Sequence, residues 1–177
     1  MVFNLQWALA YGLEGLATGT RQEEIEMRLR SPMPELNGAT TVLNGEVQKE
    51  DLIGQQPTLI HFWSVSCHLC KVAMPNINAF RDEYKDRLNV VSVHMPRSED
   101  DLDIDKIKQV AEEHGITQTI LVDNEHSITD AFENKYVPSY YVFDKTGVLR
   151  HFQAGEGGMP MLEKRVNRVL DEAAKVE

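Results

Sequence analysis

The sequence predicts an α/β sandwich whose central sheet is mixed. Strand-like and helical segments alternate three times, and a strand pair and a final helix follow. Helical segments separate the first strands, which favours parallel pairing, whereas only a turn at 144–147 separates the last two, which requires antiparallel pairing. Hydrophobic residues make up 42% of the chain, which is enough for one sizeable core.

Length, charge and cysteine content limit the classes of function. At 177 residues, the chain has the size of one domain with an extension. Its net charge of −10, with no basic stripe, opposes binding to nucleic acid. Two cysteines are too few for a scaffold of several disulfides or for a four-cysteine zinc site.

Residues 1–32 form a predicted N-terminal helical extension, and the domain is expected to run over 33–177. The first basic residue is Arg21, and Glu14 interrupts the apolar stretch, so we expect neither a secretory signal nor a membrane span. We therefore expect a cytoplasmic protein, or an extracytoplasmic one if the N-terminus is truncated. Leucines at helical spacing allow self-association through the extension.

The first elements have local justifications. A capping box followed by i,i+4 ion pairs predicts a helix over 20–30, which Pro32 ends. Asn44-Gly45 lies between short apolar runs and predicts an N-terminal β-hairpin. The run 58–65 is apolar on both alternating faces, as a buried central strand requires.

The middle of the chain continues this pattern. Apolar residues at helical spacing predict a helix over 71–85, with a kink at Pro75 near its first turns. The apolar run 89–95 predicts a second central strand. The acidic run 99–105 leads into a predicted helix over 103–114, so we expect a solvated helix start. A calcium loop is the alternative, but its ligand pattern is missing.

The last third of the chain completes the sandwich. Gly115 ends the preceding helix, as a C′ glycine does. The remaining predicted elements are a strand over 119–122, a short helix from Ser127, a strand over 139–143, a strand over 148–154 and a helix over 161–176.

The only two cysteines, Cys67 and Cys70, have C-x-x-C spacing where a strand ends and a helix begins. There the first sulfur would lie among unpaired backbone N–H groups and at the positive end of the helix dipole, both of which stabilise a thiolate. One helical turn further, the second sulfur can close a disulfide. We predict that Cys67 attacks a disulfide and that Cys70 resolves the mixed disulfide.

Two other uses of the cysteine pair stay open. Both residues could be buried and inert, although this would not explain why they share one turn after a strand. They could instead bind a metal together with His61, His68 or His94. No second C-x-x-C and no H-x-x-x-H motif is present to complete such a site.

The series HFWSVSCHLCKVAMP and the downstream stretch VPSYYVFDKTG resemble thioredoxin-like thiol-disulfide oxidoreductases of the TlpA/ResA type. The preceding segment MPELNGAT agrees with this likeness, which covers about residues 33–175. The resemblance implies a thioredoxin-like three-layer sandwich that exchanges disulfides with protein substrates and with a redox partner. It implies no cofactor and no bound metal.

The resemblance also assigns a role to the Val-Pro pair. In this family, the proline before the last strand pair has a cis peptide bond that faces the disulfide, and Pro138 matches that position. The residues by themselves allow cis or trans, since an X-Pro bond adopts both. The backbone of Val137 would pair with an extended substrate segment.

The chain departs from the family pattern at three positions. Leu69 stands where many relatives have a proline, and Ala73 replaces a frequent glutamate. His61 occupies the strand position where classical thioredoxins have a buried acid. It is either a hydrogen-bonded core residue or the base that accepts the proton of Cys70.

Two neighbours complete the predicted site. A histidinium at His68 would favour the Cys67 thiolate and make the disulfide more oxidising, whereas an exposed His68 would have no effect. Trp63 is expected to pack beneath the active-site helix. The predicted site comprises the catalytic residues Cys67 and Cys70 and the supporting residues His61, Trp63, His68, Val137 and Pro138.

Three functions compete for this site. A thiol-disulfide oxidoreductase is the leading prediction, and a metal-binding or redox-sensing module on the same fold is the alternative. Peroxide reduction is disfavoured, because Ser64 stands where the peroxidatic family has a threonine. The direction of electron flow depends on the potential of the pair against that of its compartment, which the residues do not specify.

Overall fold

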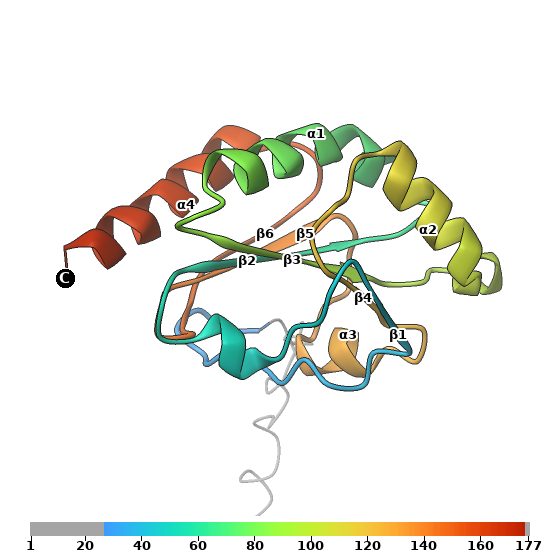
Figure 1. The fold of residues 1–177 in the computed structure, drawn as a ribbon, viewed down its shortest axis with the longest axis horizontal. Helices are drawn as coiled ribbons and strands as arrows, with labels where there is room; N and C mark the ends of the chain where they lie inside the picture. The colour runs from blue at the N-terminus through green and yellow to red at the C-terminus, as the bar shows by residue number, and fades with distance from the viewer. Residues whose placement is uncertain (1–26, 176–177) are drawn as a thin grey trace, which may run out of the picture.

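The computed structural model describes residues 27–175, which form a six-stranded sheet between two helical layers (Figure 1). The strands are β1 (Thr41–Leu43), β2 (Thr58–Trp63), β3 (Asn89–His94), β4 (Ile120–Val122), β5 (Ser139–Phe143) and β6 (Leu149–Ala154). The helices are α1 (His68–Glu83), α2 (Ile104–Glu113), α3 (Ser127–Ala131) and α4 (Met159–Ala174), with short 3-10 helices η1 (Lys49–Leu52) and η2 (Glu99–Leu102).

The strand order of the sheet is β1-β4-β3-β2-β5-β6. Strands β2, β3 and β4 are parallel, and β5 and β6 extend the sheet with antiparallel pairing. The predicted mixed sheet is therefore confirmed. Because β2 pairs with β3 on one side and β5 on the other, the segment that follows β2 begins at the middle of the sheet.

Alternate residues of β2 face the two opposite layers. Leu59 and Trp63 pack in a core shared with α1, α2 and α4, whereas Ile60 and Phe62 pack in a core shared with Met33, η1 and α3 (Figure 1). All six residues of the strand are buried. This confirms the predicted central strand and gives the three-layer arrangement.

The helices follow the predicted pattern with small shifts at their ends. Helix α1 begins three residues before the predicted start, with Cys67 as its N-cap, and Pro75 lies inside it. Asp103 caps α2 by accepting hydrogen bonds from two backbone N–H groups of its first turn. Gly115 follows α2 with φ 66°, as a C′ glycine does. Among the described residues, no helix is both long and apolar enough to cross a membrane.

The predicted N-terminal hairpin is wrong. Strand β1 pairs with β4, with Val42 opposite Leu121, so it lies at the edge of the main sheet. The side-chain amide of Asn44 donates hydrogen bonds to the carbonyls of Ile116 at 2.9 Å and Gln118 at 3.2 Å. The turn therefore fastens β1 to a segment far along the chain and does not reverse into a second strand.

The predicted helix over 20–30 is wrong in its last four residues, which are not helical and end in a turn at 29–30. Arg30 has φ 73°, and the Ser31 N–H donates to the carbonyl of Arg28 at 3.1 Å. A left-handed residue cannot continue a right-handed helix. The capping box and the proposed self-association helix fall within residues 1–26, which lie outside the described residues.

The segment before residue 33 is attached to the start of β6. The Arg30 N–H donates to the carbonyl of Leu149 at 2.8 Å, and the Leu149 N–H donates to the carbonyl of Ser31 at 2.9 Å. These two hydrogen bonds pair residues 30–31 with the outer side of β6, the edge strand of the sheet. The division of the chain at residue 32 stays a prediction.

Asn44 has φ 63°, a conformation that alanine disfavours. We predict that Asn44→Ala lowers the free energy of unfolding by about 1–2 kcal/mol, because it also removes two hydrogen bonds that hold β1. Urea denaturation at neutral pH measures the change. Asn44→Gly loses the amide but accepts the backbone conformation, so its stability should lie between those of wild type and Asn44→Ala. Equal stability of all three proteins would contradict this role of the turn.

Candidate active site

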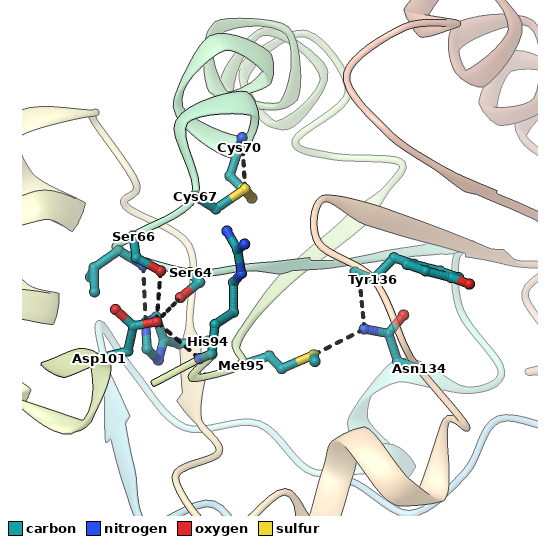
Figure 2. The surroundings of a disulfide bond; sticks show 11 residues. Ser64, Ser66, Cys67, Cys70, His94, Met95, Asp101, Asn134 and Tyr136 are labelled. Carbon is teal, nitrogen blue, oxygen red and sulfur yellow. Dashed lines mark hydrogen bonds between the residues drawn. A yellow bond between two sulfur atoms is a disulfide. The ribbon is translucent and has the colours of Figure 1, made fainter. Parts of the chain in front are cut away.

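Cys67 and Cys70 form a disulfide where β2 leads into α1 (Figure 2). Their Cα atoms are 5.3 Å apart, and the two residues are 2% and 1% exposed. The Cys67 Sγ accepts a hydrogen bond from the Cys70 backbone N–H at 3.1 Å. The predicted disulfide at the start of a helix is therefore present.

The position of Cys67 at the start of α1 determines the surroundings of its sulfur. Cys67 is the N-cap residue, so its sulfur faces the backbone N–H groups that have no partner within the helix. The first turn of α1 contains no acidic residue, which leaves the positive end of the helix dipole unopposed. Both features favour a thiolate at Cys67, the form that attacks a disulfide.

Exposed apolar side chains lie on the segments that carry the predicted site residues. Leu69 and Val72, on the first turns of α1, are 44% and 51% exposed. Tyr136, which precedes Val137, is 47% exposed (Figure 2). His68, the first residue of α1, is also exposed, and its effect on the thiolate stays a prediction. The rim of the site is therefore suited to contact apolar side chains of a polypeptide.

The Val137-Pro138 peptide bond is cis, which resolves the alternative that the residues left open. The carbonyl of Pro138 accepts a hydrogen bond from the Gly155 N–H at 2.8 Å. Within residues 27–175, the peptide groups of Val137 make no hydrogen bond. An extended segment of another polypeptide could pair with them, as predicted for a substrate.

The loop that carries this proline is organised by Asn134, which the sequence analysis missed. Its Oδ1 accepts hydrogen bonds from the Ser139 hydroxyl at 2.7 Å and the Tyr141 hydroxyl at 3.0 Å. Its Nδ2 donates to the carbonyl of Tyr136 at 2.9 Å and to the Met95 sulfur at 3.3 Å (Figure 2). No sequence pattern marks Asn134, because its partners lie on different elements.

The acidic run is not a uniformly solvated helix start, because Asp101 is fully buried. One oxygen, Oδ2, accepts hydrogen bonds from the Ser64 hydroxyl at 2.8 Å, the Ser66 hydroxyl at 2.8 Å and the Arg97 N–H at 2.9 Å. Burial raises the pKa of this carboxyl, but the three hydrogen bonds outweigh burial and hold the pKa below its usual value. Asp101 is therefore ionised at neutral pH.

His61 is buried in the middle of β2, where its ring bonds to Gln118. The two Nε2 atoms are 2.8 Å apart, and the amide group of Gln118 also accepts a hydrogen bond from Arg81 at 2.9 Å. Burial, followed by the positive charge of Arg81, lowers the pKa of His61 from 6.5 to about 3. These contacts favour the core interpretation over the base, since protonation of this ring is costly.

His94 supports the segment between β2 and the disulfide. Its Nε2 accepts a hydrogen bond from the Val65 N–H at 3.2 Å, and its ring lies edge-on to Trp63 with centroids 5.1 Å apart. Burial lowers the pKa of His94 to about 4, although Asp101 and Asp123 oppose this shift. Trp63 lies in the core that includes the buried face of α1, as expected.

The histidines considered for a metal site are spread out. His61 and His94 bond to other partners, and His68 is exposed. Among residues 27–175, no three His, Cys, Asp or Glu side chains form a group suited to a metal ion.

A family model described as the AhpC/TSA family matches residues 29–152. The chain belongs to this family. It is 73% identical over 146 residues to the thiol-disulfide oxidoreductase YkuV of Bacillus subtilis (strain 168). This match covers 82% of this chain and 99% of YkuV. It is 23% identical to the thiol-disulfide oxidoreductase ResA of Geobacillus kaustophilus (strain HTA426), over 62% of this chain and 61% of ResA.

The fold of this AhpC/TSA-family chain has a solved counterpart. The solution structure of a thioredoxin-like protein in the oxidized form matches with a TM-score of 0.77 and 73% sequence identity. The match covers 82% of this chain and 99% of that chain. The predicted thioredoxin-like fold and the resemblance to ResA-type proteins are confirmed.

We predict that the stability of the protein falls as the pH drops from 6.5 towards 4.5. His61 and His94 stay neutral in the folded state, whereas in the unfolded state they take up a proton near pH 6.5. Each such proton lowers the free energy of unfolding by about 1.4 kcal/mol per pH unit. Urea denaturation at several pH values measures the slope.

The variant His61→Gln is the control for this slope, because glutamine is polar but does not titrate. It should reduce the pH dependence by the contribution of one histidine and leave that of His94. A wild-type stability that is constant between pH 6.5 and 4.5 would contradict the neutral, buried state of both rings.

Proposed function

We propose that the chain is a thiol-disulfide oxidoreductase that exchanges disulfides with protein substrates. The disulfide at the N-terminus of α1, with a backbone N–H directed at the Cys67 sulfur, carries this proposal. The relatives YkuV and ResA, both named thiol-disulfide oxidoreductases, support it.

In the reducing direction, the Cys67 thiolate attacks one sulfur of a substrate disulfide. The substrate S–S bond breaks, one substrate sulfur bonds to Cys67, and the other leaves as a thiolate. Cys70 then loses its proton and attacks the Cys67 Sγ, which releases the second substrate thiolate and forms the Cys67–Cys70 disulfide. Two electrons move to the substrate, and its two thiolates take up the two protons.

The surroundings of the disulfide give the substrate a place to bind. The peptide groups of Val137, which make no hydrogen bond to the described part of the chain, would pair with an extended segment. The exposed side chains of Leu69, Val72 and Tyr136 would contact its side chains. In the oxidising direction, the same steps run in reverse, and a redox partner restores the starting state. Self-association through residues 1–32 and a cytoplasmic location stay predictions from the sequence.

Substitution of each cysteine tests the proposed order of attack. Cys67→Ser should lose all activity in an insulin-reduction assay, because a serine hydroxyl doesn't attack a disulfide at neutral pH. Cys70→Ser should still attack but should accumulate mixed disulfides, which non-reducing gels and mass spectrometry detect. An active Cys67→Ser protein would contradict the proposal.

A second experiment decides the role of His61. If the residue only completes the core, His61→Gln should release the mixed disulfide at a rate within about twofold of wild type. A base that takes the proton of Cys70 would instead contribute roughly 100-fold or more, so its loss would slow release by that factor. Stopped-flow kinetics of the release step distinguishes the two results.

A further inference from the structure

The buried carboxylate of Asp101 is the centre of a polar cluster that lies below the disulfide in Figure 2. Three donors converge on its Oδ2: the hydroxyls of Ser64 and Ser66, each at 2.8 Å, and the backbone N–H of Arg97 at 2.9 Å. Hydrogen bonds to a carboxylate are shorter and stronger than those between neutral groups. The cluster therefore joins the loop after β3 firmly to the segment after β2.

The segment held in this way is the turn that places the nucleophile. Its residues 64–66 lie between the end of β2 and Cys67. The Cys67 N–H donates to the carbonyl of Ser64 at 3.1 Å, and the N–H of the residue between the two serines donates to the His94 ring. Each residue of the turn thus has a side-chain or backbone bond that fixes it, and two of these bonds end on Asp101.

The position of this turn decides where the Cys67 sulfur lies relative to α1. The sulfur accepts a hydrogen bond from the Cys70 N–H only while the Cys67 backbone keeps its N-cap conformation, with φ −90° and ψ 102°. Reactions that depend on alignment can lose about 100-fold in rate when the reacting atom is misplaced by about 1 Å. A turn that is free to move would weaken both the contact with the helix and the alignment for attack.

We propose that Asp101 is a positioning residue for the Cys67 nucleophile, acting through the hydroxyls of Ser64 and Ser66. The inference rests on the proposed function, since it assumes that Cys67 attacks a disulfide. Asp101 does not touch the reacting sulfur, so it acts only through the turn. Its negative charge by itself would disfavour a nearby thiolate, which makes positioning and simple electrostatics separable by experiment.

The test uses the full chain with Cys70→Ser, in which only the first step occurs, and glutathione disulfide as the probe. The Cys67 thiolate attacks one sulfur of the probe, forms a mixed disulfide and releases one glutathione thiolate. Mass spectrometry of quenched samples gives the rate constant at each pH. The pH profile separates the pKa of Cys67 from the limiting rate of the fully formed thiolate.

We expect Asp101→Asn and Ser66→Ala each to lower the limiting rate about tenfold, as loss of a hydrogen bond to a charged group does. Asp101→Asn keeps the shape of the side chain, and Ser66 is exposed, so both proteins should fold. The double variant should be no slower than the slower single variant, since both substitutions remove the same hydrogen bond between Ser66 and Asp101. Simple electrostatics predicts instead that Asp101→Asn lowers the pKa of Cys67, and that Ser66→Ala, which keeps the charge, leaves the limiting rate unchanged.

Two matched controls lie in the same acidic loop. Asp100→Asn removes the same charge one position away, and Ser98→Ala removes a hydroxyl that caps nothing; both residues are exposed, and both variants should react at the wild-type rate. Limiting rates of Asp101→Asn and Ser66→Ala within twofold of wild type would overturn the positioning role. Failure of Cys67 to react with the probe in every protein would instead overturn the proposed function.

Discussion

The hydrogen bond between the Cys67 sulfur and the first turn of α1 sets the arrangement of the reactive pair. A sulfur at this position accepts a backbone N–H that the helix itself leaves unpaired. The buried strand β2 delivers Cys67 to this point from the middle of the sheet, and the buried face of α1 packs on that strand's own residues. The reactive group is therefore placed by a strand that is buried along its whole length.

Two groups of hydrogen bonds hold the segments on either side of the disulfide. On one side, Asp101 accepts hydrogen bonds from the turn before Cys67. On the other side, Asn134 makes hydrogen bonds to both ends of the loop that carries Pro138 (Figure 2). Buried polar groups of this kind are costly unless they are hydrogen-bonded, and they hold a unique arrangement when they are. Both groups of hydrogen bonds include the segment after β3. Its Arg97 N–H donates to Asp101, and its Met95 sulfur accepts from Asn134.

The strand position that holds an acid in classical thioredoxins holds a neutral residue here. His61 is bound by Gln118, which Arg81 binds in turn, and the positive charge of Arg81 opposes a second positive charge on the ring. This arrangement satisfies the buried ring without ionising it. The apolar core beneath α1 thus contains one hydrogen bond between neutral groups, and the charged Arg81 contacts it only through Gln118.

Local patterns in the sequence determined most of the fold and the reactive pair. Apolar periodicity, turn residues and a C-x-x-C motif act over a few neighbouring residues, so they predicted β2, α1, the strand pair at the end of the chain and the disulfide. The pairing of β1, the turn at Arg30, the cis bond of Pro138 and the hydrogen bonds of Asp101 and Asn134 became known only from the three-dimensional structure. Asn44 bonds across 72 and 74 residues, and Asp101 across 35 and 37. Such partners are chosen by the packing of whole elements, which no short stretch of sequence specifies.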